Sequence, residues 1–473
     1  MIKTRVAALA TAVTLLLTLF PAAMASAAVP ELRLRLVATS DVVRLRSYGG
    51  EGVFLDLGAY VAASGATFDL RVRRDPLGPD VHATWASPGG NVAVPDGLLD
   101  GWAGLHRFFW LDVFQDGERI KHRGLTFCPN AYDVQRLDDT GPTDPTFPDA
   151  CGYHPFTLGM PWGIDEGWGV NTASYDGNQV LHVPAGWYRM VLQVRPAFRR
   201  LFGIDPADAE VVVRVHVRAG GGCFECPHGR AAAPTPRLAG VPDDTTPAPW
   251  TVPDLAALPA YAVTVESRRG RDLLSFAANV WNAGPAPLHV EGFREPGADL
   301  MDAYQYFTQN GQIISRAPVG AFEFEQHADH SHWHFQQFAG YRLLDDTQTQ
   351  VVRSRKAAFC LAPTDPIDLL VPNAARRLTE LGFSQCGGPS ALWIRELLPV
   401  GWGDTYYQGI FGQGFNITDV PNGSYFIEVA ANPLGLLYDG DATNDVTLRE
   451  VILGGVPAAR TVTVLPWNGI DTG

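Results

Sequence analysis

The sequence predicts an all-β protein made of two tandem β-sandwich-like domains. Short segments in which Val, Leu, Phe and Ala alternate with polar residues run through both halves, and Gly, Pro, Asn and Asp separate them. Long stretches with helical periodicity are scarce, and short helical turns are expected only near residues 206–210 and 373–381. Short alternating segments divided by turn residues are typical of antiparallel sandwiches.

The same landmarks occur in the same order in the two halves, at similar spacings. The matched pairs are segments 52–72 and 272–290, Phe127-Cys128 and Phe359-Cys360, Cys151 and Cys386, Gly167-Trp168-Gly169 and Gly401-Trp402-Gly403, and segments 183–188 and 420–425. Each of the last two segments has the composition of a hairpin turn. The repetition indicates an internal duplication.

The N-terminal residues have the layout of a cleavable secretory signal. Lys3 and Arg5 precede an apolar run over residues 6–20, and Ala25-Ser26-Ala27 follows it. We expect a signal peptide at residues 1–27, a first domain at 28–218, a linker rich in Gly, Pro, Ala and Thr at 219–253, and a second domain at 254–473. The N-terminal run is too short for a stable membrane span, and no later stretch approaches about 18 uninterrupted apolar residues, so a secreted protein without a transmembrane segment is predicted.

The charge balance narrows the choice of partners. The chain carries 36 basic and 50 acidic residues, a formal net charge of −14. Such a balance disfavours nucleic acid as a partner and would attract cationic substrates, although the same charge also keeps an exported protein in solution.

Six cysteines favour disulfides in an oxidising compartment. The repeat pairs Cys128 with Cys151 and Cys360 with Cys386, because each pair closes a loop at the same place in its copy. The remaining two, Cys223 and Cys226, are followed by His228 and could form a redox or zinc half-site. A small local disulfide is the favoured reading of that pair.

Four of the twelve histidines lie within eight residues, His327 to His334. On an extended strand, alternate residues share a face, so His330, His332 and His334 can direct their imidazoles together if a curve or bulge gathers them. Three neutral imidazoles suit copper or zinc, and the affinity order favours Cu²⁺. His327 would lie on the opposite face of such a strand, where it could contact one of the three metal-binding histidines but not the metal ion. A histidine run that binds no metal is the alternative.

The sequence around and after these histidines carries a further ordered set of motifs. They are Tyr341-Arg342-Leu343-Leu344, Lys356-Ala357-Ala358-Phe359-Cys360-Leu361, Asp404-Thr405-Tyr406, Ile417-Thr418-Asp419-Val420, Gly423-Ser424-Tyr425, Asn432-Pro433 and Thr443-Asn444. Together with the histidine cluster, this collinear set resembles the catalytic core of the lysyl oxidase family. The resemblance implies a secreted bacterial copper amine oxidase of this family.

The resemblance implies that His330, His332 and His334 bind copper, and that Lys356 and Tyr406 form a lysine tyrosylquinone. A quinone provides an electron sink that ordinary side chains lack. The implied reaction is the oxidative deamination of primary amines, with peptidyl lysine as the expected substrate. It consumes O2 and yields an aldehyde, hydrogen peroxide and ammonia.

The reaction also needs a base for the α-proton, and Asp404 is the candidate, because it shares a strand face with Tyr406. A role for Asp404 in capping a turn after Gly403 remains open. Lys356 by itself would be read as a surface lysine. Strand alternation allows only one of Tyr406 and Tyr407 to face the metal, and the resemblance selects Tyr406.

The front copy lacks the residues that the resemblance assigns to copper binding and cofactor formation. Gly124 stands at the position of Lys356, Thr172 at about that of Tyr406, and only His106 remains near the histidines. A structural role is expected for this copy, ahead of substrate positioning or a chaperone-like role. Gly340 stands where animal members of the family carry a histidine, so ligand geometry could differ. A secreted copper-binding or scavenging protein and a surface structural or adhesion protein are the competing functions.

Overall fold

The fold is that of a computed structural model, which describes residues 31–48, 52–76, 78–173, 180–219, 241–327, 330–354, 356, 358–378, 384, 386–410 and 412–472. Strands β1–β32 dominate these residues, and they are accompanied by four short helices. The helices are α1 (Pro196–Phe202), η1 (Gly101–Ala103), η2 (Pro206–Asp208) and η3 (Pro249–Thr251). The prediction of an all-β protein is confirmed at this level.

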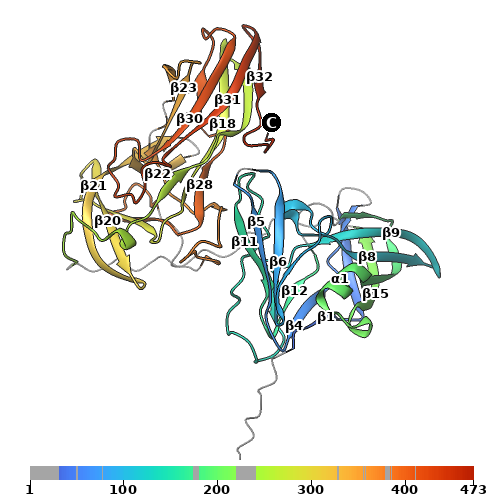
Figure 1. Cartoon of the computed structure of the whole chain (residues 1–473). Helices are drawn as coiled ribbons and strands as arrows, with labels where there is room; N and C mark the ends of the chain where they lie inside the picture. Colours follow the sequence, from blue (N-terminus) through green and yellow to red (C-terminus); the bar gives the residue numbers. More distant parts are fainter. Residues whose placement is uncertain are drawn as a thin grey trace, which may run out of the picture.

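The front half contains three hydrogen-bonded sheets (Figure 1). The first is ordered β1 (Arg33–Ala38), β4 (Ala59–Ser64), β12 (Trp168–Asn171), β10 (Val134–Arg136). The second is ordered β11 (Gly159–Ile164), β5 (Phe68–Arg74), β6 (Val81–Ser87), β7 (Gly90–Ala93). The third is ordered β13 (Val180–His182), β3 (Gly52–Phe54), β2 (Val42–Tyr48), β15 (Glu210–Ala219), β14 (Gly186–Val194), β8 (Leu105–Gln115), β9 (Glu118–Phe127). Strands β2 and β15 pair in parallel, whereas the other pairs are antiparallel.

The C-terminal half also contains three principal sheets. The first is ordered β16 (Leu255–Ala257), β18 (Arg271–Asn282), β28 (Trp402–Tyr406), β26 (Asp365–Pro366), and β17 (Tyr261–Arg268) and β29 (Gly414–Asn416) also pair with β18. The second is ordered β25 (Ala358–Phe359), β22 (His330–Gln336), β21 (Gln312–His327), β20 (Leu300–Gln309), β19 (Leu288–Phe293), β27 (Trp393–Leu398). The third is ordered β24 (Gln350–Arg353), β23 (Ala339–Leu344), β30 (Gly423–Ala431), β31 (Val446–Val456), β32 (Ala459–Val464).

Alternation along the strands explains how these sheets face their cores. In β5, Phe68, Leu70 and Val72 are buried, whereas Arg71 and Arg73 are exposed. The side-chain period of two in a strand puts the apolar set on one face. Each half has its own large cluster of buried apolar residues, one centred on strands of β1–β15 and one on strands of β16–β32.

The sequence did not predict helix α1. Pro196 occupies its first turn, where the missing N–H costs nothing, and Gly203 ends it with φ of +66°. Phe198 and Phe202 lie on its buried side. The helix is only seven residues long, too short to give a periodic pattern that separates it from a strand.

The two halves meet through the segments that follow Cys151 and Cys360. The Leu158 N–H donates to the Ile367 carbonyl at 2.7 Å, and the Leu369 N–H donates to the Gly159 carbonyl at 2.8 Å. A Cβ atom on Gly159 would lie 2.3 Å from Asp368 Oδ1, so this approach requires glycine. A small apolar cluster closes the junction; it contains Phe156, Ala256, Leu258, Trp281, Ile367 and Ile470.

Part of the predicted linker packs on the C-terminal half. The Asp244 N–H donates to the Arg316 carbonyl at 2.8 Å, and Val252 lies in an apolar cluster with Phe307 and Ala317. The predicted signal peptide, Cys223 and Cys226 lie outside the described residues. Within the described part of the chain, none of the helices has the length and apolar character needed to cross a membrane.

Candidate active site

The histidine cluster forms a hairpin rather than one extended strand. Strand β21 ends at His327 and β22 begins at His330, and the register pairs these two positions directly. The backbone of the hairpin therefore brings positions 327 and 330 next to each other. The expectation for His327 assumed a single strand, and its role beside the metal ligands stays a prediction. The side chains of His327 and His330 lie outside the described part of the structure.

The two faces of this hairpin differ sharply in polarity. Phe322, Phe324, Trp333 and Phe335 occupy one face, as directly paired aromatic rings. Glu323, Glu325, His332 and His334 occupy the other face. The repeated Phe-Glu pattern at 322–325 is a signal for such a strand, and the sequence reasoning did not use it.

The two described histidines are close enough to act together. The ring centroids of His332 and His334 are 4.6 Å apart, and His334 is fully buried. Nδ1 of His334 lies 2.6 Å from Glu325 Oε2. A carboxylate at one ring nitrogen orients the imidazole and directs the other nitrogen, Nε2, to a metal. Glu325 is thus a functional candidate that the sequence reasoning missed.

Lys356 is buried, which rules out its reading as a surface lysine. Its side chain is 7% exposed, and Nζ lies 4.9 Å from the centroid of the Tyr406 ring and 5.1 Å from that of Phe359. Burial lowers the pKa of the Lys356 amine, while the charges of Glu325 and Asp404 oppose this effect. A lowered pKa increases the neutral, nucleophilic fraction of the amine.

Tyr406 ends strand β28 with its ring inside the protein. The hydroxyl donates to the Cys360 carbonyl at 2.7 Å, and the ring packs edge-on against Phe359 at 4.7 Å. Burial, then the nearby Asp404 and Glu396 carboxyls, raise the pKa of the phenol well above its usual value. The neighbouring Tyr407 is 52% exposed, as strand alternation requires.

Asp404 lies in strand β28, two residues before Tyr406, and not in a turn. The carboxyl is buried, and Oδ2 has no hydrogen-bond partner among the described residues. Burial raises the pKa of this carboxyl well above its usual value, and Lys356 opposes the shift. The structure therefore excludes the turn-capping alternative and leaves a desolvated carboxyl beside the phenol.

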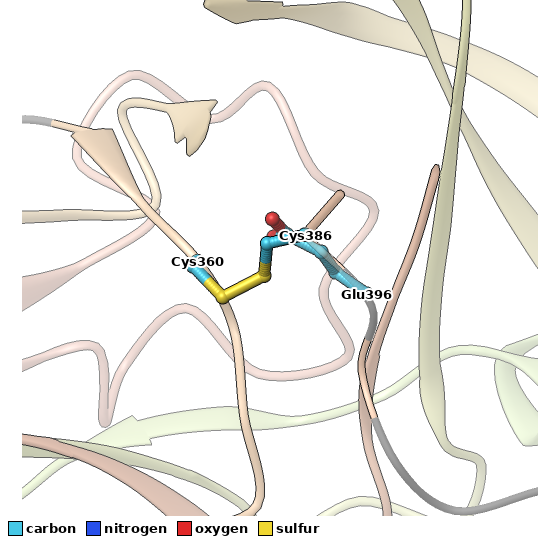
Figure 2. A group of neighbouring side chains, drawn as sticks. All are labelled: Cys360, Cys386 and Glu396. Atoms are coloured by element: carbon cyan, nitrogen blue, oxygen red, sulfur yellow. A yellow bond between two sulfur atoms is a disulfide. The ribbon is translucent and has the colours of Figure 1, made fainter. Parts of the chain in front are cut away.

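A second buried carboxyl, Glu396, lies beside the disulfide of the C-terminal half (Figure 2). The Leu361 N–H donates to Glu396 Oε2 at 3.0 Å, and burial raises the pKa of the carboxyl. Cys360, Cys386 and Glu396 lie within reach of a shared ion, but the two sulfurs are bonded to each other. This group is therefore not a thiolate metal site.

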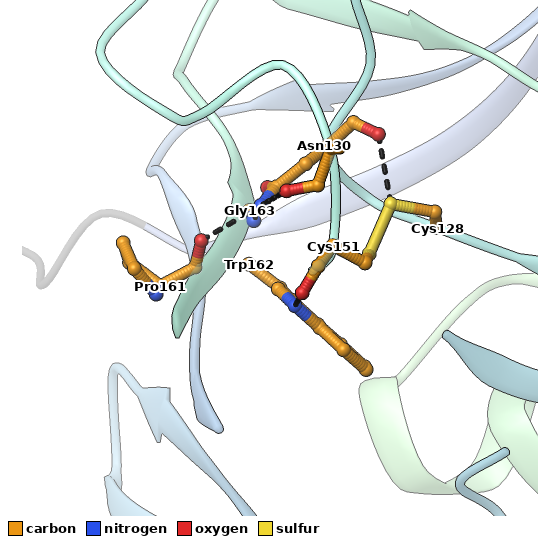
Figure 3. The surroundings of a disulfide bond; sticks show 7 residues. Cys128, Asn130, Cys151, Pro161, Trp162 and Gly163 are labelled. Atoms are coloured by element: carbon orange, nitrogen blue, oxygen red, sulfur yellow. Dashed lines mark hydrogen bonds between the residues drawn. A yellow bond between two sulfur atoms is a disulfide. The ribbon is translucent and has the colours of Figure 1, made fainter. Parts of the chain in front are cut away.

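The front half contains the other predicted disulfide, Cys128–Cys151, in different surroundings (Figure 3). The Asn130 side chain donates to the Pro161 carbonyl at 2.9 Å and accepts from the Gly163 N–H at 3.0 Å. The Trp162 Nε1–H donates to the Cys151 carbonyl at 2.8 Å. These partners fix a loop and provide no acid, amine or phenol for chemistry.

The positions that correspond to Lys356 and Tyr406 cannot reproduce the site in the front half. A Cβ atom on Gly124 would lie 2.7 Å from the Arg107 side chain and 2.9 Å from Trp110, so a longer side chain there would require these neighbours to shift. Thr172 is buried but has no ring to oxidise.

A separate set of oxygen donors lies in the loop between β30 and β31. The side chains of Asp439 and Asp445 share a hydrogen bond, and Asn444 Oδ1 is buried without a partner among the described residues. Burial and the adjacent Asp439 raise the pKa of Asp445 to about 7. Carboxylate and amide oxygens are the ligands that a hard cation such as Ca²⁺ prefers, so these residues could hold one. The sequence signal is the Asp-Gly-Asp-x-x-Asn-Asp pattern at 439–445.

The fold and these contacts define a β-rich protein with a buried group of imidazole, amine, phenol and carboxyl side chains. Residues 300–459 match the family model described as lysyl oxidase. This C-terminal region of the chain belongs to the lysyl oxidase family.

Several relatives match about a third of the chain. The chain is 32% identical over 149 residues to protein-lysine 6-oxidase of Homo sapiens, which is 31% of this chain and 32% of that protein. It is equally identical to protein-lysine 6-oxidase of Sus scrofa, of which it covers 54%. It is 31% identical over 139 residues to lysyl oxidase homolog 2 of Xenopus tropicalis, covering 29% of this chain and 16% of that protein. The chain thus spans about a third to a half of the protein-lysine 6-oxidases and less of the homolog.

Proposed function

We propose that this protein is a copper- and quinone-dependent amine oxidase that converts primary amines to aldehydes with release of hydrogen peroxide and ammonia. The observation that carries the proposal is the packing of the Lys356 amine over the Tyr406 ring in a buried, acid-lined site. The family membership of residues 300–459 and the names of the relatives, protein-lysine 6-oxidases, support it. Peptidyl lysine is the proposed substrate.

The metal would be held by His330, His332 and His334. The described pair fits this role, because two imidazoles lie side by side and Glu325 engages Nδ1 of one of them. Imidazole donors suit Cu²⁺, and a carboxylate behind a histidine ligand raises its basicity. Copper would supply the oxidative chemistry toward O2 that no side chain here provides.

A lysine tyrosylquinone would form from Lys356 and Tyr406. When formed, it would supply the electron sink for amine oxidation. The chain's own contribution is to hold the amine against the ring, to keep it partly neutral by burial, and to anchor the phenol on the Cys360 carbonyl. Asp404 would take the proton from the substrate carbon, as a desolvated carboxylate two residues from the ring.

The domain organisation that we propose is an internal duplication, with residues 28–218 as a degenerate copy, 219–253 as a linker and 254–473 as the catalytic domain. The strand orders support it. In the front half β4 pairs with β12 and β12 with β10, and in the C-terminal half β18 pairs with β28 and β28 with β26. Export through a signal peptide at residues 1–27 completes the proposal, and the front copy would serve a structural role.

The test replaces Tyr406 by Phe in the copper-loaded protein and uses Tyr407→Phe as the matched control. Both variants lose one hydroxyl, but only the first loses the ring oxygen on which quinone formation depends. We expect Tyr406→Phe to abolish peroxide release from primary amines and labelling by a hydrazine, while bound copper stays unchanged. Tyr407→Phe should keep both activities.

Retained turnover in Tyr406→Phe would contradict the quinone assignment. A protein that binds copper but shows neither hydrazine labelling nor turnover before substitution would favour the copper-scavenging function instead.

A further inference from the structure

A basic groove lies between the two halves, and none of its lining residues belongs to the candidate active site. It has a volume of about 340 Å³ and is lined by Arg71 and Arg73 of β5 and, on the other side, by segment 369–374 and Arg376 of the C-terminal half. Small-molecule sites typically measure about 300–1,000 Å³, so the groove has room for a small ligand.

The strand geometry of β5 presents two of the arginines together. Leu70 and Val72 are fully buried, so Arg71 and Arg73 lie on the opposite, solvent-facing side of the strand. Positions two apart on a strand are about 7 Å apart. Two guanidinium groups at that spacing can each bind one oxyanion group of the same molecule.

The other wall is fixed in place by the backbone of the junction. The Leu369 N–H donates to the Gly159 carbonyl at 2.8 Å, and Arg73 Nη2 donates to the Leu370 carbonyl at 3.5 Å. The Ala375 N–H donates to the Val400 carbonyl at 3.1 Å. Arg376 is therefore carried on a segment that is anchored at both of its sides.

The groove is locally basic in a protein whose net charge is −14. Two carboxyls lie near the three arginines. The Asp69 carboxyl interacts electrostatically with Arg376 and Arg71. The Asp368 carboxyl lies 3.8 Å from the Arg73 guanidinium. One positive charge remains in excess. Burial raises the pKa of both carboxyls, which weakens their neutralising effect further.

We propose that this groove binds a small ligand with two or more oxyanion groups, held by Arg71, Arg73 and Arg376. Arginine is suited to this task, because its planar fork pairs with the two oxygens of a carboxylate or phosphate group. The shared chemistry covers polycarboxylates and pyrophosphate-type compounds. The ligand would bridge the halves, since two of the arginines belong to the front half and one to the C-terminal half.

Isothermal titration calorimetry of the full exported protein tests this inference with citrate and pyrophosphate as separate probes. The variant is Arg71→Gln/Arg376→Gln, which removes two guanidinium groups that make no direct hydrogen bond in the described structure. The matched control is Arg44→Gln/Arg46→Gln, a pair of exposed arginines two residues apart on β2. Both probes also chelate metal, so the result is read from the difference between variant and control.

We expect binding of at least one probe to weaken tenfold or more in the groove variant and to stay unchanged in the control, with equal melting temperatures for the two. Citrate alone would identify a polycarboxylate ligand, and pyrophosphate alone a phosphate ligand. Absence of binding by either probe at millimolar concentration, or the same affinity in variant and control, would overturn the inference.

Discussion

At the scale of single residues, the proposed cofactor depends on the environment of Lys356 and Tyr406. Only the resemblance to a family singles out this lysine and this tyrosine in the sequence. By itself, a lysine that follows Arg353 and Arg355 would be expected on the protein surface. What the residue types cannot reveal is burial. The structure places the amine over the ring at 4.9 Å, in surroundings that lower its pKa.

Asp404 shows which part of the site could be predicted and which could not. Its shared face with Tyr406 follows from strand alternation and agrees with the structure. Glu325 and Glu396 were not predicted, because nothing local in the sequence shows that the folded chain brings a distant carboxyl to a histidine or to a disulfide loop.

Replacing Asp404 by Asn should lower amine turnover by about 10²- to 10⁴-fold, the usual contribution of a general base. Burial raises the pKa of Asp404 in the folded protein, so the wild-type rate should fall on acidification at a pH above that of an ordinary aspartate, as the carboxylate becomes protonated. The residual rate of the variant should lack this acidic limb. A pH–rate profile beside the exposed Asp419→Asn control provides the measurement; the same acidic limb in Asp404→Asn would rule out this base.

At the scale of elements, the histidine hairpin is a feature that strand alternation alone did not predict. Alternation correctly places His332 and His334 on one face, but it treats the histidine run as one strand, although Asp329 within it is a turn-forming residue. Helix α1 was not predicted for a related reason, because a helix of seven residues is too short to give a periodic pattern.

The loop at 439–445 leads to a prediction for this scale. The carboxyls of Asp439 and Asp445 lie side by side beside the buried, unpartnered Asn444 Oδ1, and a hard cation would neutralise their repulsion and bind all three oxygens. Adding Ca²⁺ after chelation should raise the melting temperature, and the rise should grow with the logarithm of the Ca²⁺ concentration above the dissociation constant. Differential scanning calorimetry should show this rise for wild type and for the exposed control Asp346→Asn, but not for Asp445→Asn. A melting temperature that does not respond to Ca²⁺ would show that these oxygens bind no such ion.

At the scale of the whole molecule, the sequence predicts two β-rich halves, and the structure contains a separate apolar core in each. The contact between the halves was not predicted. It depends on Gly159, at the start of β11, approaching Asp368 and on Phe156 packing with Ile367, and both pairs are far apart in sequence.

The junction should make stability depend on pH through His154. Burial lowers the pKa of this imidazole to about 3, against an ordinary value of 6.5. The unfolded chain therefore binds the extra proton between these values, and the free energy of unfolding should fall as pH decreases from about 6.5 toward 3, by up to about 1.4 kcal/mol per pH unit from this group.

His154→Asn tests this dependence. The Asn side-chain oxygen can still accept from the Phe156 N–H, as Nδ1 does at 3.2 Å, but it does not titrate. Urea unfolding at several pH values should give a shallower slope for the variant than for the exposed control His82→Asn. Equal slopes for the two variants would mean that His154 does not contribute to acid sensitivity.

The central claim is that Lys356 and Tyr406 become one covalent cofactor. The most direct measurement is mass spectrometry of the copper-loaded protein after exposure to oxygen, reduction of disulfides and proteolysis. The chain contains three lysines, at positions 3, 121 and 356, so a cross-linked lysine is readily assigned. We expect a single oxidised species that joins the peptides of Lys356 and Tyr406. Separate, unmodified peptides from a protein with verified copper would contradict it.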